Sequence, residues 1–271
     1  MALTGDTYKR LARILVEAEV SGKALAEPPS EFLTLTLTDA YMVQAEAARL
    51  REGSGEAQIG WKTMGTNPAI RSRSGGLMTE PARGYLFESA PVQGRLTIPS
   101  GMNALAEPEV TFVLGKDLGG PGVSAEDAVA ATKEICASIE VAWTRFEEQP
   151  HAFALIADNA GAARVVLSSQ RVTVDEVGGL AALAGLTVEF QKNGETVQTG
   201  SGVDVHGNPG NAVAWVANHL AQHGLGLKAG QVILAGSLTL PTPIQPGDVV
   251  TARFDKLGDV TVRLAAPGSA S

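Results

Sequence analysis

The sequence predicts an α+β fold built around a rolled or barrel-like mixed β-sheet, with helices on its flanks. From Ile59 onward, short apolar runs alternate with Gly and Pro, which is typical of many short strands joined by turns. Two helical patterns interrupt these strands, without the regular strand–helix–strand rhythm of a doubly wound sheet. Asn193 and Gly194 stand between two alternating arms, a strong hairpin signal. These observations favour the α+β class over a doubly wound sheet.

The N-terminal part of the chain has a helical pattern. Apolar residues follow helical spacing over residues 6–21, and Gly22 ends that helix. A second helix is expected with Asp39 as its N-cap and Gly53 as its end. We therefore expect a helical subdomain over residues 1–55.

The remaining residues divide into a strand-rich domain and a short tail. Residues 56–265 carry the strands, including a second hairpin candidate in "FDKLGDVTVRL". One helix is expected to follow Ser124, and another to run from Asn211 to Gly224. The tail, residues 266–271, looks frayed.

The composition indicates a soluble protein that acts on a small molecule. The chain of 271 residues is 44% hydrophobic and has a net charge of -8, without a basic block for nucleic acid. Cys136 is the single cysteine, so no intrachain disulfide is possible. The first residues lack the apolar core of a signal peptide, and no apolar run reaches the roughly 18 residues of a membrane span. We therefore expect a cytoplasmic protein that binds neither nucleic acid nor membrane.

Three glutamates form a candidate metal site. Glu107 and Glu109 begin the apolar segment "EPEVTFVLGKD", and in a strand such residues project from one face about 6.5 Å apart. Pro108 between them favours an extended backbone. Glu140, in "CASIEVAWTRF", is a third acid on an expected strand. Three oxygen ligands suit Mg²⁺ or Mn²⁺, but a solvated strand edge has the same pattern.

The histidines do not suggest a metal site. They show neither the H-E-x-x-H pattern nor a pairing with cysteines: His151, His206, His219 and His223. His219 and His223 stand near a helix end, where we interpret them as structural.

Six segments together resemble one enzyme group. They are "IGWKTMGTNPAI", "EPEVTFVLGKDL", "SIEVAWTRF", "ADNAGAARVVL", "NPGNAVAWVANHL" and "AGQVILAGSLTLPTPIQPGDVVTARFDKLGDVTVRL". Their order and spacing resemble the 2-oxopent-4-enoate hydratase and 4-oxalocrotonate decarboxylase branch of the fumarylacetoacetate hydrolase superfamily. The resemblance implies a fumarylacetoacetase-like catalytic domain over residues 56–265. It also implies that Glu107, Glu109 and Glu140 bind Mg²⁺ or Mn²⁺.

The resemblance assigns further residues to the active site. Lys62 matches the active-site lysine, which binds the substrate carboxylate or moves a proton near it. Asp158 and Asn159 match a pair that shapes a turn beside the site, and Ser237 matches a pocket-lining turn. All four are expected to contact or position the substrate.

Two segments depart from the family pattern. Hydratases of this group carry a "PDxG"-like stretch whose aspartate handles protons, whereas this chain has Ala82 there, in "EPARG". Glu80 and Arg83 are the candidates to substitute for that acid. Arg73 is a candidate for a second substrate carboxylate, with an exposed loop arginine as the alternative.

A second departure lies before the helix expected from Asn211. There the chain has Asn208 in place of a histidine, with His206 two residues earlier.

The function implied is a hydratase, a lyase that adds water to a short 2-hydroxy-2,4-dienoate (2-oxo-4-enoate) from aromatic-compound breakdown. Alternatives on the same metal are a 4-oxalocrotonate-type decarboxylase and a carbon–carbon hydrolase. A non-catalytic partner subunit is a third possibility, because Ala82 replaces an acid. The family also implies a homo-oligomer.

Overall fold

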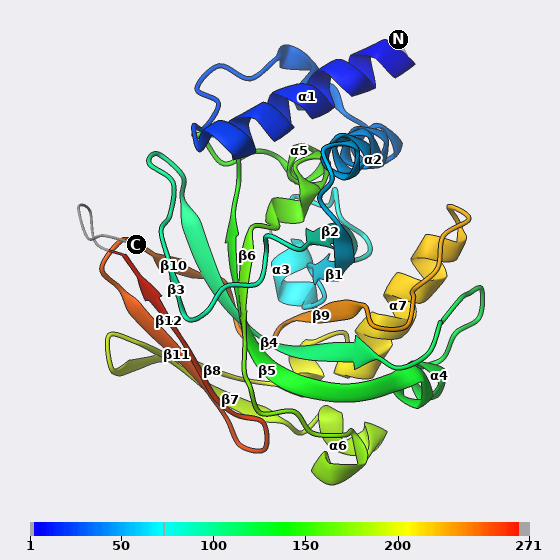
Figure 1. Ribbon diagram of the computed structural model, residues 1–271, viewed down its shortest axis with the longest axis vertical. Helices are drawn as coiled ribbons and strands as arrows, with labels where there is room; N and C mark the ends of the chain where they lie inside the picture. Colours follow the sequence, from blue (N-terminus) through cyan, green and yellow to red (C-terminus); the bar gives the residue numbers. More distant parts are fainter. Residues whose placement is uncertain (1–2, 73, 266–271) are drawn as a thin grey trace.

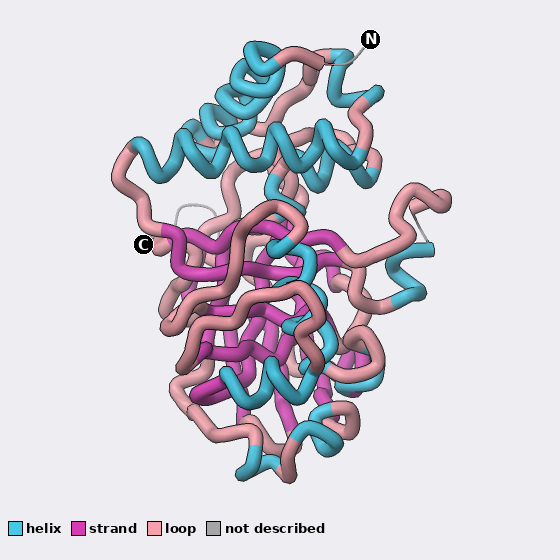
Figure 2. The backbone as a smooth tube through the Cα atoms, turned by 90° about the vertical axis from the view of Figure 1, so that its right-hand side faces the viewer, coloured by secondary structure: helices cyan, strands magenta, loops and turns pink. Residues whose placement is uncertain are grey.

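The computed structural model describes residues 3–72 and 74–265, and it has the expected α+β architecture (Figure 1). Helices at one end lie over two β-sheets, and the long strands of the larger sheet curl around the centre of the molecule. Figure 2 shows the same division, with long helices at one end and the strands gathered below them. The predicted tail, residues 266–271, and Arg73 lie outside the described residues.

The larger sheet is mixed and has seven strands. Its order is β2-β1-β9-β4-β5-β6, with β10 paired to β4, and β1 and β9 run parallel while the other pairs are antiparallel. The strands are β1 (Gln58–Met64), β2 (Ala82–Phe87), β4 (Ala104–Leu114), β5 (Thr132–Trp143), β6 (Arg164–Leu167), β9 (Val232–Ser237) and β10 (Thr242–Ile244).

The smaller sheet contains both predicted hairpins. Its order is β3-β12-β11-β7-β8. The strands are β3 (Arg95–Leu96), β7 (Thr187–Lys192), β8 (Glu195–Ser201), β11 (Val249–Phe254) and β12 (Gly258–Leu264). Asn193 adopts a φ of 54° in the β7–β8 turn, a conformation that Asn accepts more readily than most residues. Apolar side chains of both sheets share one core cluster, which includes Ile139, Val141 and Val262.

The N-terminal helices are α1 (Gly5–Ser21) and α2 (Leu37–Gly53), joined through the 3₁₀ helix η1 (Ser30–Thr34). Gly22 ends α1 in the left-handed conformation, as predicted. The predicted N-cap Asp39 is wrong. Thr36 caps α2, and Asp39 is its third residue, where it completes a capping box with the Thr36 backbone.

These helices pack on the strand-rich part of the chain. Leu11, Phe32 and Val43 share one buried cluster with Ala82 and Ile156. The division at residue 55 therefore stays a prediction, because the two parts are joined by a common core.

The remaining helices connect strands or cover the larger sheet. They are α3 (Pro68–Ser72), α4 (Ala125–Ala131), α5 (Ala152–Ala157), η2 (Asn159–Gly161), η3 (Asp175–Val177), α6 (Leu180–Leu183), η4 (Gly202–Asp204) and α7 (Pro209–Ala221). Helix α7 begins two residues before the predicted Asn211, because Asn208 caps it and Pro209 takes the first helical position. No helix in the described part of the chain is long and apolar enough to cross a membrane.

Candidate metal centre and active site

Three carboxylates from two neighbouring strands converge inside the molecule. Glu107 and Glu109 lie within β4, and Glu140 lies in β5 directly opposite Glu107. One oxygen from each of the three lies within 4.8 Å of the others. Glu109 and Glu140 are almost completely buried, at 1% exposure. The expectation that the pair begins its strand is wrong, since β4 already starts at Ala104.

The cluster is unfavourable as a set of charges. Like charges directly opposite each other on a sheet destabilise it, and burial penalises each carboxylate further. Burial raises the pKa of Glu140 to about 7, although Lys62 acts to lower it. Burial and the charges of Glu140 and Glu107 raise the pKa of Glu109 well above its ordinary value. Burial also raises the pKa of Glu107.

A divalent cation fits this cluster. Both side-chain oxygens of Glu140 are buried, and Oε1 has no partner among the described residues, whereas Oε2 lies 3.0 Å from Nζ of Lys62. Buried carboxylate oxygens are normally paired or bound to a metal. Carboxylate oxygens are also the ligands that Mg²⁺ and Mn²⁺ prefer. The unpartnered Oε1 of Glu140 and the spacing of the three carboxylates together make this a candidate metal centre.

Lys62 adds a buried cation to the same cluster. Its Nζ lies 3.0 Å from Oε2 of Glu140 and donates a hydrogen bond to the carbonyl of Ala160 at 3.1 Å. Burial favours the neutral amine, but the charges of the three glutamates outweigh it and raise the pKa of Lys62. The lysine is therefore held as an ammonium beside the candidate metal ligands.

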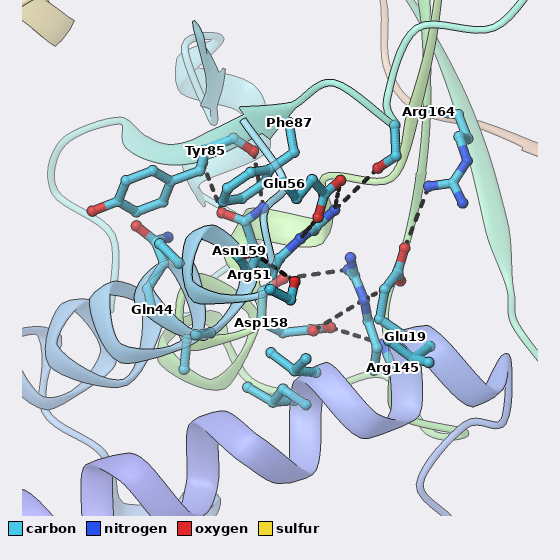
Figure 3. Close-up of a pocket in the computed structure, with 18 residues that line it drawn as sticks. Glu19, Gln44, Arg51, Glu56, Tyr85, Phe87, Arg145, Asp158, Asn159 and Arg164 are labelled. Atoms are coloured by element: carbon cyan, nitrogen blue, oxygen red, sulfur yellow. Dashed lines mark hydrogen bonds and ion pairs between the residues drawn. The ribbon is translucent and has the colours of Figure 1, made fainter. Parts of the chain in front are cut away.

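The turn at Asp158 and Asn159 holds the carbonyl that binds Lys62. Asn159 and Ala160 both adopt a φ of 54°. The Asn159 side chain exchanges two hydrogen bonds with the backbone of Tyr85, at 2.7 and 2.9 Å, and so fixes the turn to the edge of β2 (Figure 3). Asn159 therefore helps to hold the Ala160 carbonyl in position beside Lys62.

Buried ion pairs connect this turn to the N-terminal helix. Asp158 accepts hydrogen bonds from the Thr144 hydroxyl and the Arg145 backbone, and its Oδ1 lies 3.4 Å from Nε of Arg145. Arg145 also pairs with Glu19 of α1 at 2.8 Å, and Glu19 contacts Arg164 as well. Glu19, Arg145, Asp158 and Arg164 line a cavity of about 330 Å³. Figure 3 shows these side chains pointing toward one another. None of the three glutamates lines that cavity.

Ser237 lies next to Glu109 in the sheet, whereas Lys62 contacts Glu140. The neighbouring backbone N–H of Gly236 donates to Oε2 of Glu109 at 2.7 Å. Gly236 has a φ of 107°, and a Cβ there would lie 2.1 Å from the Thr66 hydroxyl oxygen. A glycine is therefore required for this N–H to reach the carboxylate. The sequence analysis did not identify Gly236, because this contact joins residues far apart in the chain.

The two residues proposed to replace the missing acid are not brought to the cluster. Glu80 is exposed, in the loop before β2. Arg83 pairs with Thr63 in the β1–β2 ladder, so its side chain leaves the sheet on the face opposite Lys62. The geometry therefore does not bring Arg83 to the carboxylate cluster. Ala82 lies in an apolar cluster.

Comparison with known proteins agrees with the fold. The chain is 32% identical over 264 residues to a 4-oxalocrotonate decarboxylase of Pseudomonas sp. (strain CF600), covering 96% of this chain and 98% of that protein. It is 34% identical over 246 residues to a 2-hydroxyhexa-2,4-dienoate hydratase of Comamonas testosteroni, covering 89% of each.

A solved structure is similar over nearly the whole chain. It is the 4-oxalocrotonate decarboxylase from Pseudomonas putida G7, complexed with magnesium and adipate, with a TM-score of 0.89 and 32% identity. The match covers 97% of this chain and 99% of that one. Residues 77–265 also match the family model described as fumarylacetoacetate (FAA) hydrolase C-terminal. The chain therefore belongs to the fumarylacetoacetate hydrolase family.

Proposed function

We propose that this protein is a divalent-metal-dependent lyase that adds water to a short 2-hydroxy-2,4-dienoate, the enol form of a 2-oxo-4-enoate. The observation that carries the proposal is the set of three converging carboxylates, two of them buried and Glu107 half-buried, beside a buried ammonium. The similar hydratase of Comamonas testosteroni supports it.

Glu107, Glu109 and Glu140 would hold Mg²⁺ or Mn²⁺. The ion would supply Lewis-acid stabilisation of negative charge on the oxygens of a 2-oxo acid. The magnesium-containing structure of the similar decarboxylase supports a divalent ion of this kind.

Lys62 would bind the substrate and hold a proton. Its raised pKa keeps the side chain as an ammonium, which can pair with a substrate carboxylate or donate a proton to a nearby carbon. The Ala160 carbonyl orients the amine, and the turn at Asp158 and Asn159 supports that carbonyl. Ser237, next to the Glu109 side of the cluster, is the proposed hydroxyl contact for the substrate.

Decarboxylation is the second candidate because of Ala82. Adding water to a double bond calls for a group that directs the water and its proton. At Ala82, where the resemblance expects an aspartate, the surroundings are apolar. Loss of CO₂ places less demand on such a group, and two of the similar proteins are 4-oxalocrotonate decarboxylases.

A direct assay distinguishes these activities. The purified protein would be mixed with 2-hydroxypenta-2,4-dienoate or with 4-oxalocrotonate, in Mg²⁺ and in EDTA, while the ultraviolet absorbance and the products are followed. Mg²⁺-dependent formation of a 4-hydroxy-2-oxo acid supports the hydratase. Release of CO₂ without hydration supports the decarboxylase, and cleavage of a carbon–carbon bond by water supports a hydrolase.

The non-catalytic alternative has its own signature. Binding of Mn²⁺ and oxalate without turnover of any 2-oxo acid would replace the enzymatic proposal with a partner subunit. We also propose that the chain forms a homo-oligomer, which analytical ultracentrifugation would test.

A further inference from the structure

A groove of about 720 Å³ lies between helices α2 and α7, over β1 and β2. Its aromatic walls come from three parts of the chain: Tyr41 on α2, Trp61 and Tyr85 on the strands, and His219 and His223 on or just after α7. Trp61 and Tyr85 are partners in the β1–β2 ladder, so they lie on the face of the sheet opposite Lys62. The groove is therefore separate from the candidate metal centre.

Arg83 lines this groove as a buried cation. The residue is 3% exposed, and its guanidinium carbon lies 4.9 Å, 4.8 Å and 5.4 Å from the ring centres of Tyr41, Trp61 and Tyr85. Nη1 donates to Oε1 of Gln44 at 2.9 Å. No carboxylate forms an ion pair with Arg83 among the residues that the structure describes.

The aromatic rings only partly compensate for burying this charge. Cation–π contacts stabilise a buried cation, but a guanidinium has five N–H donors and favours a bidentate carboxylate. The buried Nε of Arg83 has no acceptor among the described residues. The guanidinium therefore keeps unused capacity for an anion.

Two further buried nitrogen atoms at the groove lack hydrogen-bond partners. Nε1 of Trp61 and Nδ1 of His219 are buried without partners within the described part of the chain. Burial, followed by the charges of Arg83 and His223, lowers the pKa of His219 to about 4, and the pKa of His223 is lowered too. Both rings are therefore neutral near pH 7.

Arg83 differs from the other cations at the groove. Arg49 on α2 pairs with Glu46, and Lys228 before β9 pairs with Asp117 at 2.9 Å. Arg83 is the cation of this set without a carboxylate partner among the described residues, and Glu52 is the acid that lines the groove.

We propose that this groove binds a small aromatic carboxylate, with its carboxylate paired to Arg83 and its ring among the aromatic side chains. Planar rings pack well against Tyr, Trp and His, and Arg binds a carboxylate through two parallel hydrogen bonds. The site is independent of the proposed reaction at the three glutamates.

Benzoate is a suitable probe, and calorimetry in EDTA measures its binding without a divalent metal. Saturable binding of one benzoate per chain is expected. Arg83→Met should weaken it by about tenfold or more, because a charge-assisted pair is lost. Arg49→Met is the matched control, since Arg49 is an exposed arginine at the same groove, and it should change the affinity much less.

Lys62→Met separates the groove from the metal centre. Benzoate binding that is lost in Lys62→Met but kept in Arg83→Met would overturn the proposal, as would the absence of binding at about 10 mM benzoate. A crystal of the unaltered protein soaked in benzoate provides a readout that does not depend on variant folding. Benzoate oxygens at hydrogen-bond distance from Arg83 support the site, and a groove filled by a second copy of the chain refutes it.

Discussion

Nζ of Lys62 and Oε2 of Glu140 lie 3.0 Å apart, and both side chains are almost completely buried. Their strands are not neighbours in the sheet, since β9 and β4 lie between β1 and β5. The pair therefore spans the curled sheet and joins the ammonium to the carboxylate cluster.

Replacing Lys62 should separate catalysis from metal binding. Lys62→Met removes the ammonium, so kcat/KM should fall by about 100-fold or more, as for loss of a general acid or base. Metal affinity should stay the same or rise, because a competing positive charge is gone. Absorbance assays and metal titration would check the two effects, and a parallel loss of metal binding would contradict them.

Replacing Glu109 should abolish the stabilisation of the folded protein by Mg²⁺. Glu109→Gln removes one of three crowded charges, so the metal-free protein should become more stable. Thermal unfolding in EDTA and in Mg²⁺ would measure both states. The unaltered protein should gain stability from Mg²⁺, whereas the variant should not. A variant with an unchanged response to Mg²⁺ would exclude Glu109 as a ligand.

Metal affinity should depend on pH near neutrality. The pKa of Glu140 is about 7, so protons compete with the metal, and affinity should fall as the pH is lowered through that value. Metal titrations across this range would show the slope. The titrations would run from about pH 8 to about pH 5, on both sides of the Glu140 pKa. A metal affinity that stays constant over this range would argue against a buried carboxylate ligand.

The same pKa predicts the opposite trend for the stability of the metal-free protein. Because the folded pKa of Glu140 is raised above its unfolded value, the folded state binds the proton more tightly. This contribution is complete below the unfolded pKa of about 4.3 and is lost as the pH rises through about 7. Denaturant unfolding in EDTA would detect it, and Glu140→Gln should reduce the dependence.

Glu19 should contribute strongly to stability through Arg145 and Arg164. Glu19→Gln leaves the buried guanidinium of Arg145 with only part of its pairing, so unfolding free energy should fall by about 3 kcal/mol. Urea denaturation would measure this change. Glu17→Gln, at an exposed position of the same helix, is the control and should have little effect. Equal effects of the two substitutions would refute the role of the buried network.

Local patterns were sufficient to predict much of the fold. Gly22, the Asn193–Gly194 turn and the alternating strands follow from backbone preferences within a few residues. Helix ends were less certain. Thr36 and Asp39 can both cap a helix, and the reciprocal hydrogen bonds of the capping box decided between them.

Only part of the candidate site could be predicted from local patterns in the sequence. Alternation along one strand was enough to put Glu107 and Glu109 on a common face. The contact of Lys62 with Ala160 and the Gly236 N–H on Glu109 join segments far apart in the chain, and no local pattern indicates them.

By itself, the sequence determined the α+β class, the hairpins and the placement of Glu107 and Glu109 on one face of a strand, because each depends on neighbours along the chain. Only the tertiary structure decided that Glu140 stands opposite Glu107 and that Arg83 leaves the sheet on the other face from Lys62. The physical reason is strand register: a shift of one residue would turn every side chain to the opposite face, and packing of the whole core selects the register.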